Sequence, residues 1–188
     1  MNEGWIETYT GKRIYPLHPD PEQIDICDIA HHLSLICRYT GACSQFYSVA
    51  QHSIHVSYIV RQLIPEAVDE EYRRKSILTA LLHDAAEAYL GDMSSPVKQS
   101  MPKYVEAEKV LLGMIMKKFG AVGGDWEIVK KADYIMLATE TRQFMNSKGE
   151  GWYLPEPPRV EVIQEFSNEE VEIAFLKCFQ IYYEKESC

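Results

Sequence analysis

The feature that most constrains the fold of this chain is a succession of six segments in which apolar residues recur every three or four positions. This spacing places the apolar side chains on one face of a helix, and glycines or prolines separate most of the segments. We therefore predict helices over residues 25–37, 48–64, 70–90, 102–119, 125–145 and 168–184. Ser48, Pro102 and Asp125 are residue types that favour helix starts, and Gly91 favours a helix end.

The segment before the first helix has a different pattern. Residues 5–15 are rich in aromatic and β-branched side chains around Gly11, which predicts a short β-hairpin. Residues 92–101 and 146–159 are predicted loops because they contain several glycines, prolines and serines. The predicted fold is therefore all-α, a helical bundle with a short N-terminal β-hairpin, and residues 1–188 form one domain.

Charge and composition exclude several classes of protein. The chain has 28 acidic and 19 basic residues and a net charge of -9, which argues against binding to a nucleic-acid polymer. No apolar run reaches the roughly 20 residues needed to span a bilayer, so we expect no membrane association. The five cysteines lack CxxC spacing and the chain opens without a signal-peptide pattern, so we expect a cytoplasmic protein.

The adjacent pair His83 and Asp84 has the chemistry of a metal site. Neighbouring residues of a helix differ in direction by about 100°, so the two side chains do not share a face. Imidazole nitrogen and carboxylate oxygen together suit Zn, Mn, Fe, Co or Ni better than Ca. Two ligands alone do not hold a catalytic ion, and His52 and Asp133 on other predicted helices are candidate partners. His55 competes with His52 for this role.

Short motifs surround these candidate ligands. They are ICRY at 36–39, SVAQHS at 48–53, HDAAE at 83–87, and GD at 91–92 followed by PVK at 96–98. In this order they resemble the HD-domain superfamily of metal-dependent phosphohydrolases. Within it, the chain is most similar to small bacterial 5'-deoxynucleotidases and to related phage deoxynucleoside triphosphohydrolases. The similarity covers residues from about 25 to 139.

The resemblance implies a divalent transition-metal ion bound by four residues from three helices. Its ligands would be His52, His83, Asp84 and Asp133, and the family position favours His52 over His55. The implied ion is Zn, Co or Mn, with Mg as an additional candidate. Four such ligands leave coordination positions open for water and a phosphate oxygen.

The resemblance also assigns roles to residues around the ion. Glu87 and Asp92 are candidates for acid and base catalysis, since Glu87 follows His83 by one helical turn. Arg38 and Lys98 are candidates for binding phosphate. Tyr39 stands where bacterial relatives have a tryptophan, so it would stack on the nucleoside. The alternative interpretation is that Glu87 and Asp92 are solvated acids at a helix end and that Arg38 and Lys98 are surface charges.

Two substrates follow from the resemblance. The segment at 5–12 and the segment at 46–50 look more like the phage branch, which favours hydrolysis of dATP to deoxyadenosine and triphosphate. The alternative is a 5'-deoxynucleotidase that releases phosphate from deoxynucleoside monophosphates. A different class is a non-catalytic module that binds metal and nucleotide. Hydrolysis of a guanosine tetraphosphate alarmone is a further option, but the short chain shows no accompanying regulatory domain.

The same resemblance bears on assembly and location. Small relatives often form oligomers, so we expect a homo-oligomer in the cytoplasm of a bacterium or of a phage-infected host cell. The aromatic segment 152–155, within the predicted loop 146–159, would either contribute to an interface or cover the substrate pocket. Its sequence does not favour one of these uses over the other.

Overall fold

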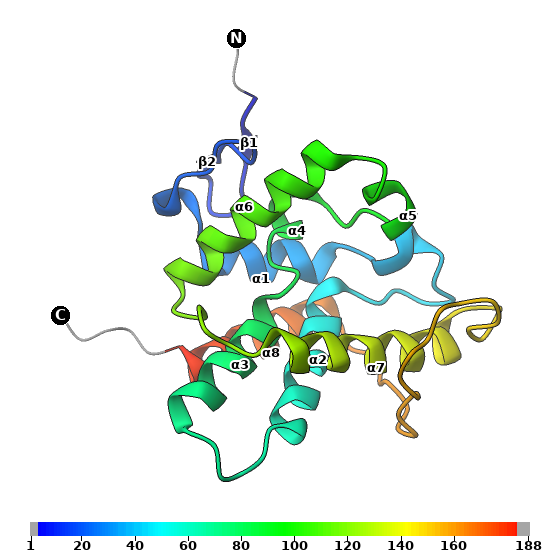
Figure 1. The fold of residues 1–188 in the computed structure, drawn as a ribbon. Coiled ribbons are helices and arrows are strands. Elements are labelled where there is room, and N and C mark those ends of the chain that lie inside the picture. Colours follow the sequence, from blue (N-terminus) through cyan, green and yellow to red (C-terminus); the bar gives the residue numbers. More distant parts are fainter. Residues whose placement is uncertain (1–3, 184–188) are drawn as a thin grey trace.

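The computed structural model describes residues 4–183 and confirms an all-α bundle with a short N-terminal hairpin (Figure 1). The strands are β1 (Ile6–Glu7) and β2 (Arg13–Ile14), and two 3₁₀ turns are η1 (Pro21–Gln23) and η2 (Arg38–Gly41). The helices are α1 (Ile26–Leu35), α2 (Val49–Leu63), α3 (Glu70–Leu82), α4 (Glu87–Leu90), α5 (Ser95–Lys98), α6 (Pro102–Lys118), α7 (Trp126–Phe144) and α8 (Asn168–Tyr182).

Side-chain caps explain where several helices begin. The Asp25 carboxylate accepts a hydrogen bond from the Cys27 amide at the start of α1, and Ser48 accepts one from Gln51 at the start of α2. Asp125 accepts two amides of the first turn of α7. Each cap satisfies an amide that has no partner within its own helix, and a cap of this kind stabilises a helix by about 1 kcal/mol.

Helix α2 lies in the middle of the bundle and packs against α1, α3, α7 and α8. One hydrophobic cluster joins α1, α6 and α8 and includes Leu33 and Phe175. A second cluster joins α2, α3 and α7 and includes Val60 and Ala132. The packing therefore holds α2 firmly against the two other helices whose residues we predicted as metal ligands.

The predicted helix over residues 70–90 is interrupted, which corrects the sequence-based expectation. Helix α3 ends at Leu82, and the amides of Ala85 and Glu87 donate to carbonyls three residues earlier, at 2.9 and 3.0 Å. The His83 ring explains the break, because its Nδ1 lies 2.7 Å from the carbonyl oxygen of Ala80. A continued helix would need that carbonyl for the amide of residue 84, so the chain tightens into 3₁₀-like turns.

Other predicted boundaries shift by smaller amounts. The predicted loop 92–101 contains the single helical turn α5, and α1 ends at Leu35 rather than at residue 37. The predicted end of the last helix, Glu184, lies outside the described residues, as does Cys188. The four cysteines within the described range are free. None of the helices at 4–183 has the length and apolar character needed to cross a bilayer.

The hairpin is fastened to α1 through its turn. The Thr10 amide and hydroxyl donate to the two carboxylate oxygens of Asp28 at 2.7 and 3.0 Å, and Lys12 Nζ lies 2.7 Å from Asp25. Asp28 is fully buried, so these hydrogen bonds are shielded from water. The hairpin is therefore a packed part of the bundle rather than a loose extension.

His31 and His32 also attach the hairpin to the helical bundle. His31 stacks on Tyr9 with ring centroids 3.6 Å apart, and its Nδ1 lies 2.9 Å from Glu172 of α8. The Tyr9 amide donates to His32 Nε2 at 3.1 Å. The other ring nitrogen of His32 donates to the carbonyl of Ala88 in α4, at 2.7 Å. The hairpin is thus connected through His32 to the short helix that follows the His83-Asp84 pair.

Candidate metal and phosphate site

A cavity of about 820 Å³ opens between the turn after α3, helix α5, helix α7 and the loop after α7. Its lining includes both charged and aromatic residues. We use the name inner cluster for six charged or titratable residues that line the cavity or lie behind its wall: Arg38, His52, His83, Asp84, Asp133 and Glu140. We use the name rim for four lining residues from α7 and the loop after it: Lys130, Tyr134, Trp152 and Tyr153.

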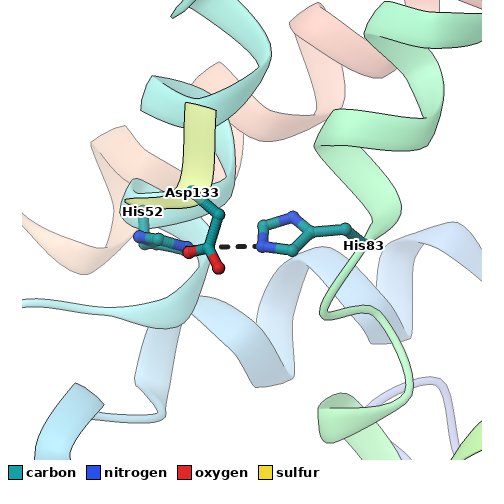
Figure 2. A group of neighbouring side chains, drawn as sticks. All are labelled: His52, His83 and Asp133. Atoms are coloured by element: carbon teal, nitrogen blue, oxygen red, sulfur yellow. Dashed lines mark hydrogen bonds and ion pairs between the residues drawn. The ribbon is translucent and has the colours of Figure 1, made fainter. Parts of the chain in front are cut away.

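Three of the predicted metal ligands point toward one another from α2, the end of α3 and α7 (Figure 2). His52 Nε2 lies 3.3 Å from His83 Nε2 and 3.2 Å from Asp133 Oδ1. The fourth, Asp84, places Oδ2 3.3 Å from His83 Nε2 and 3.8 Å from His52 Nε2. The fold therefore brings His52, His83 and Asp133 within 4.8 Å of one another, and the turn after Leu82 places Asp84 beside the two histidines.

Both histidines have their other ring nitrogen occupied. His83 Nδ1 donates to the carbonyl of Ala80, and His52 Nδ1 donates to Glu140 Oε1 at 2.6 Å. A carbonyl and a carboxylate only accept, so in the neutral rings both Nδ1 atoms carry the hydrogen. The two Nε2 atoms consequently face each other as lone pairs, which is the arrangement of metal-binding imidazoles held by a neighbouring acceptor.

The donor set fits a divalent transition-metal ion. Two imidazole lone pairs and two carboxylates crowded together repel one another unless positive charge lies between them. Burial and the Arg38 charge lower the pKa of His52, but the carboxylates of Glu140 and Asp133 outweigh them and raise this pKa to about 9. The site therefore favours bound positive charge, which either a metal ion or a proton on His52 can supply.

Glu140 is a member of the inner cluster that the sequence-based prediction missed. It is fully buried, and its carboxylate accepts hydrogen bonds from His52 Nδ1, from Arg38 Nε at 3.2 Å and from the Tyr39 hydroxyl. Burial raises the pKa of Glu140, but the positive charges of Arg38 and His52 have the larger, opposite effect. The pKa of Glu140 is therefore lowered to about 2. A signal was present, because Glu140 follows Asp133 by seven residues and so shares its face of α7.

Arg38 and Tyr39 reach the cavity from an irregular turn. Tyr39 and Thr40 have positive φ angles of 56° and 52°, a conformation that costs non-glycine residues about 1–3 kcal/mol. The hydrogen bonds to Glu140 hold this turn in place, and Arg38 also lies 3.6 Å from Asp84. The guanidinium and the Tyr39 ring both line the cavity.

Glu87 lies at the start of α4 with only 5% of its surface exposed. Its Oε1 is 3.6 Å from Lys98 Nζ, and its Oε2 has no hydrogen-bond partner in the described part of the chain. Burial, together with the nearby Asp84 and Asp92 carboxylates, raises the pKa of Glu87 well above its ordinary value. A buried carboxylate oxygen without a partner, facing a cavity, is typical of a group that acts on a ligand.

Asp92 and Lys98 line the same cavity. Burial raises the pKa of Asp92 above its ordinary value. Lys98 Nζ lies 2.6 Å from Glu108 of α6, so its ammonium group is held near Glu87 by a second carboxylate. His55, the competitor of His52, instead lines a separate cavity of about 250 Å³ beside Arg159. The geometry therefore favours His52.

Comparison with known proteins places the chain in a family. Residues 26–119 match the family described as "5'-deoxynucleotidase YfbR-like". The uncharacterized protein YfdR of Escherichia coli K12 is 40% identical over 148 residues, which cover 79% of this chain and 76% of that protein. An uncharacterized protein of Rhodobacter capsulatus is 39% identical over 123 residues, which cover 64% of this chain and 60% of the relative. The family match includes most of the inner cluster but ends before α7 and the rim.

Proposed function

The chain belongs to the YfbR-like 5'-deoxynucleotidase family of the HD-domain superfamily, and from this premise we propose that it hydrolyses the 5'-phosphoester of a deoxynucleoside monophosphate. The observation that carries the proposal is a cluster of three candidate metal ligands, with Asp84 beside it, at a cavity lined by Arg38, Lys98 and Glu87, whose Oε2 is unpartnered among the described residues. A non-catalytic module would gain nothing from burying that carboxylate oxygen without a partner.

A divalent ion held by His52, His83, Asp84 and Asp133 would polarise a phosphate oxygen and acidify a water molecule. The Arg38 guanidinium would bind the phosphate and offset the negative charge that grows on it during transfer. Lys98, which lines the same cavity, would contribute a second positive charge. These groups bind and orient the phosphate for in-line attack.

Proton transfer would involve the two cavity carboxyl groups. In its ionised form, Glu87 would take a proton from the attacking water as the new oxygen–phosphorus bond forms. The bond between phosphorus and the 5'-oxygen then breaks. Asp92, in its protonated form, would give its proton to that oxygen, so that the products are a deoxynucleoside and inorganic phosphate. Burial raises the pKa of both carboxyl groups, so each holds a proton more readily than an exposed carboxyl group does.

The second candidate is the dATP triphosphohydrolase favoured by the sequence. Lys130 supports it, because this rim lysine forms no ion pair with any residue at 4–183 and lies one helical turn before Asp133. Its ammonium group is therefore open to the additional phosphates of a triphosphate. A cavity of about 820 Å³ is also large enough for such a substrate.

Product analysis distinguishes the two candidates. The protein is incubated with each deoxynucleoside mono- and triphosphate and with Co, Mn, Zn or Mg, and the products are separated by anion-exchange chromatography. Release of phosphate from monophosphates supports the first proposal, and release of intact triphosphate from dATP supports the second. If every nucleotide remains intact with every metal, both are rejected.

We also propose homo-oligomerisation and a cytoplasmic location, which rest on the resemblance alone. Light scattering coupled to size-exclusion chromatography would give the number of subunits directly. A monomeric mass at micromolar concentration would contradict the first of these proposals.

A further inference from the structure

The aromatic residues of the rim have a degree of exposure that packing does not explain. Tyr153 is 80% exposed and Trp152 is 39% exposed, yet both line the cavity. The Trp152 ring meets the edge of Tyr39 at a centroid distance of 5.9 Å, and the Tyr153 ring meets Tyr134 at 6.5 Å. These edge-to-face contacts leave ring surface available at the cavity.

A compact turn holds these two rings in place. Gly149 and Gly151 have φ angles of 91° and 79°, and the Trp152 amide donates to the Gly149 carbonyl at 3.1 Å. Gly149 lies so close to Leu154 that an added Cβ would be 2.9 Å from its Cδ1 atom. The segment at 149–153 is thus folded against its surroundings, and its glycines are required by its conformation.

The cavity lining therefore has two chemically different parts. One part offers Arg38, Lys98 and the candidate metal ligands, which suit phosphate, whereas the rim offers aromatic rings, which suit a flat apolar group. A nucleotide joins a phosphate to a planar base. A phosphorylated sugar without a base would leave the aromatic part unused.

We propose that Trp152 and Tyr153 form a nucleobase subsite in which the base of the substrate stacks on their rings. This inference rests on the proposed function, because it places the phosphate of the same molecule at the inner cluster. It assigns the loop after α7 to substrate selection, and it makes a nucleotide rather than a small sugar phosphate the preferred substrate. Stacking increases with ring area, so the subsite favours purines over pyrimidines.

The first test compares a nucleotide with a base-free analogue. The variants Trp152→Ala and Tyr153→Ala are assayed with deoxyadenosine monophosphate and with 2-deoxyribose 5-phosphate. We expect kcat/KM for the nucleotide to fall about 10-fold in each variant while that for the sugar phosphate stays the same. Trp152→Phe, which keeps an aromatic ring, is expected to retain most of the activity.

Tyr58→Ala is the matched control, since Tyr58 is 52% exposed and lies outside this cavity. We expect it to behave as the wild type with both substrates. Equal losses on the two substrates in the rim variants would show that the rings are only structural. Unchanged activity on the nucleotide would also overturn the subsite.

A binding experiment separates this inference from the proposed function. Deoxyadenosine, which has no phosphate, is titrated while tryptophan fluorescence is followed, and the expected quenching disappears in Trp152→Phe. Absence of quenching in the wild type overturns the subsite even if hydrolysis is observed. Quenching without hydrolysis of any nucleotide rejects the proposed function and leaves the subsite supported.

Discussion

The inner cluster and the rim lie in one cavity but are built in opposite ways. Apart from Arg38, which comes from the turn η2, residues of the inner cluster come from packed helices or their ends, and His52 and Glu140 are fully buried. Rim residues come from an exposed face of α7 and from a loop, and Lys130 has no ion pair within residues 4–183. Under the proposed function and the proposed base subsite, this contrast places the type of reaction and the choice of substrate in separate parts of the chain. Variants of the two regions should therefore have separable effects.

The largest effect is expected from a ligand of the inner cluster. Asp133→Ala removes a carboxylate 3.2 Å from His52 Nε2, so we expect metal affinity to fall by more than the 10- to 100-fold typical of outer-shell residues. Activity should fall below detection. Isothermal titration with Co or Mn measures the affinity, and circular dichroism checks the fold. Unchanged metal binding would remove Asp133 from the ligand set.

Glu87→Gln should separate catalysis from binding within the cavity. The amide has the same shape but accepts no proton from water, so we expect kcat to fall by about 10²- to 10⁴-fold with metal affinity unchanged. Steady-state kinetics and the same titration measure both quantities. A fully active variant would contradict the assignment of Glu87 as a base.

Glu140→Gln should have a smaller effect that acts through its neighbours. The neutral amide holds Arg38 and the His52 ring less strongly, so we expect metal affinity to fall about 10- to 100-fold. The free energy of unfolding should also decrease, because a buried Arg38 loses its charged partner. Metal titration and chemical denaturation measure these changes.

Glu172→Gln is the control for this variant. Glu172 of α8 also contacts a histidine, because its Oε2 lies 2.9 Å from Nδ1 of His31 in α1, and neither residue lines the cavity. Its substitution should leave metal affinity unchanged. If both variants lose metal affinity equally, the effect comes from general destabilisation rather than from positioning of the ligands.

Gly149→Ala should affect the rim and leave the inner cluster unchanged. The new methyl group would clash with Leu154 in a backbone conformation that alanine disfavours. We expect KM for the nucleotide to rise several-fold with unchanged metal affinity. Gly120→Ala introduces backbone strain at a φ of 67° with no nearby atoms, and should leave KM unchanged. A change in metal affinity would mean that the two regions are not separable.

The smallest effect is expected from Lys130→Ala. An exposed charge contributes about 0.2–1 kcal/mol, so kcat/KM for a triphosphate should fall by about 1.4- to 5-fold. Activity on a monophosphate should not change, since the single phosphate would be bound by Arg38 and Lys98. Equal loss on both substrates would contradict a role for Lys130 in binding additional phosphates.

The sequence predicts the inner cluster better than the rim, and the reason is physical. His52, the His83-Asp84 pair and Asp133 are residue types with strong metal chemistry on helices that periodicity identifies. The break after Leu82 was not predicted, because the residues around it are good helix formers and the cause is a hydrogen bond from the His83 ring. Local sequence patterns do not show that a side chain competes with a backbone amide for one carbonyl oxygen.

Glu140 and the rim show a different limit of prediction from the sequence. A glutamate on a helix is usually solvated, and only the arrival of Arg38 and His52 from distant segments makes Glu140 a buried partner. The loop after α7 contains enough glycine and proline to be identified as irregular, but its placement beside Tyr39 depends on contacts far apart in the sequence. Its position at the cavity favours the pocket-covering alternative over an interface.

The attachment of the hairpin has a consequence for hydrogen exchange. The Tyr9 amide donates to His32, and His32 donates to the Ala88 carbonyl, next to Glu87. Slow exchange of the Tyr9 amide would therefore report that α4 and the Glu87 carboxylate are in place, although Tyr9 and α4 lie far apart in the chain. A small molecule that occupies the cavity and steadies α4 should slow the exchange of that remote amide as well.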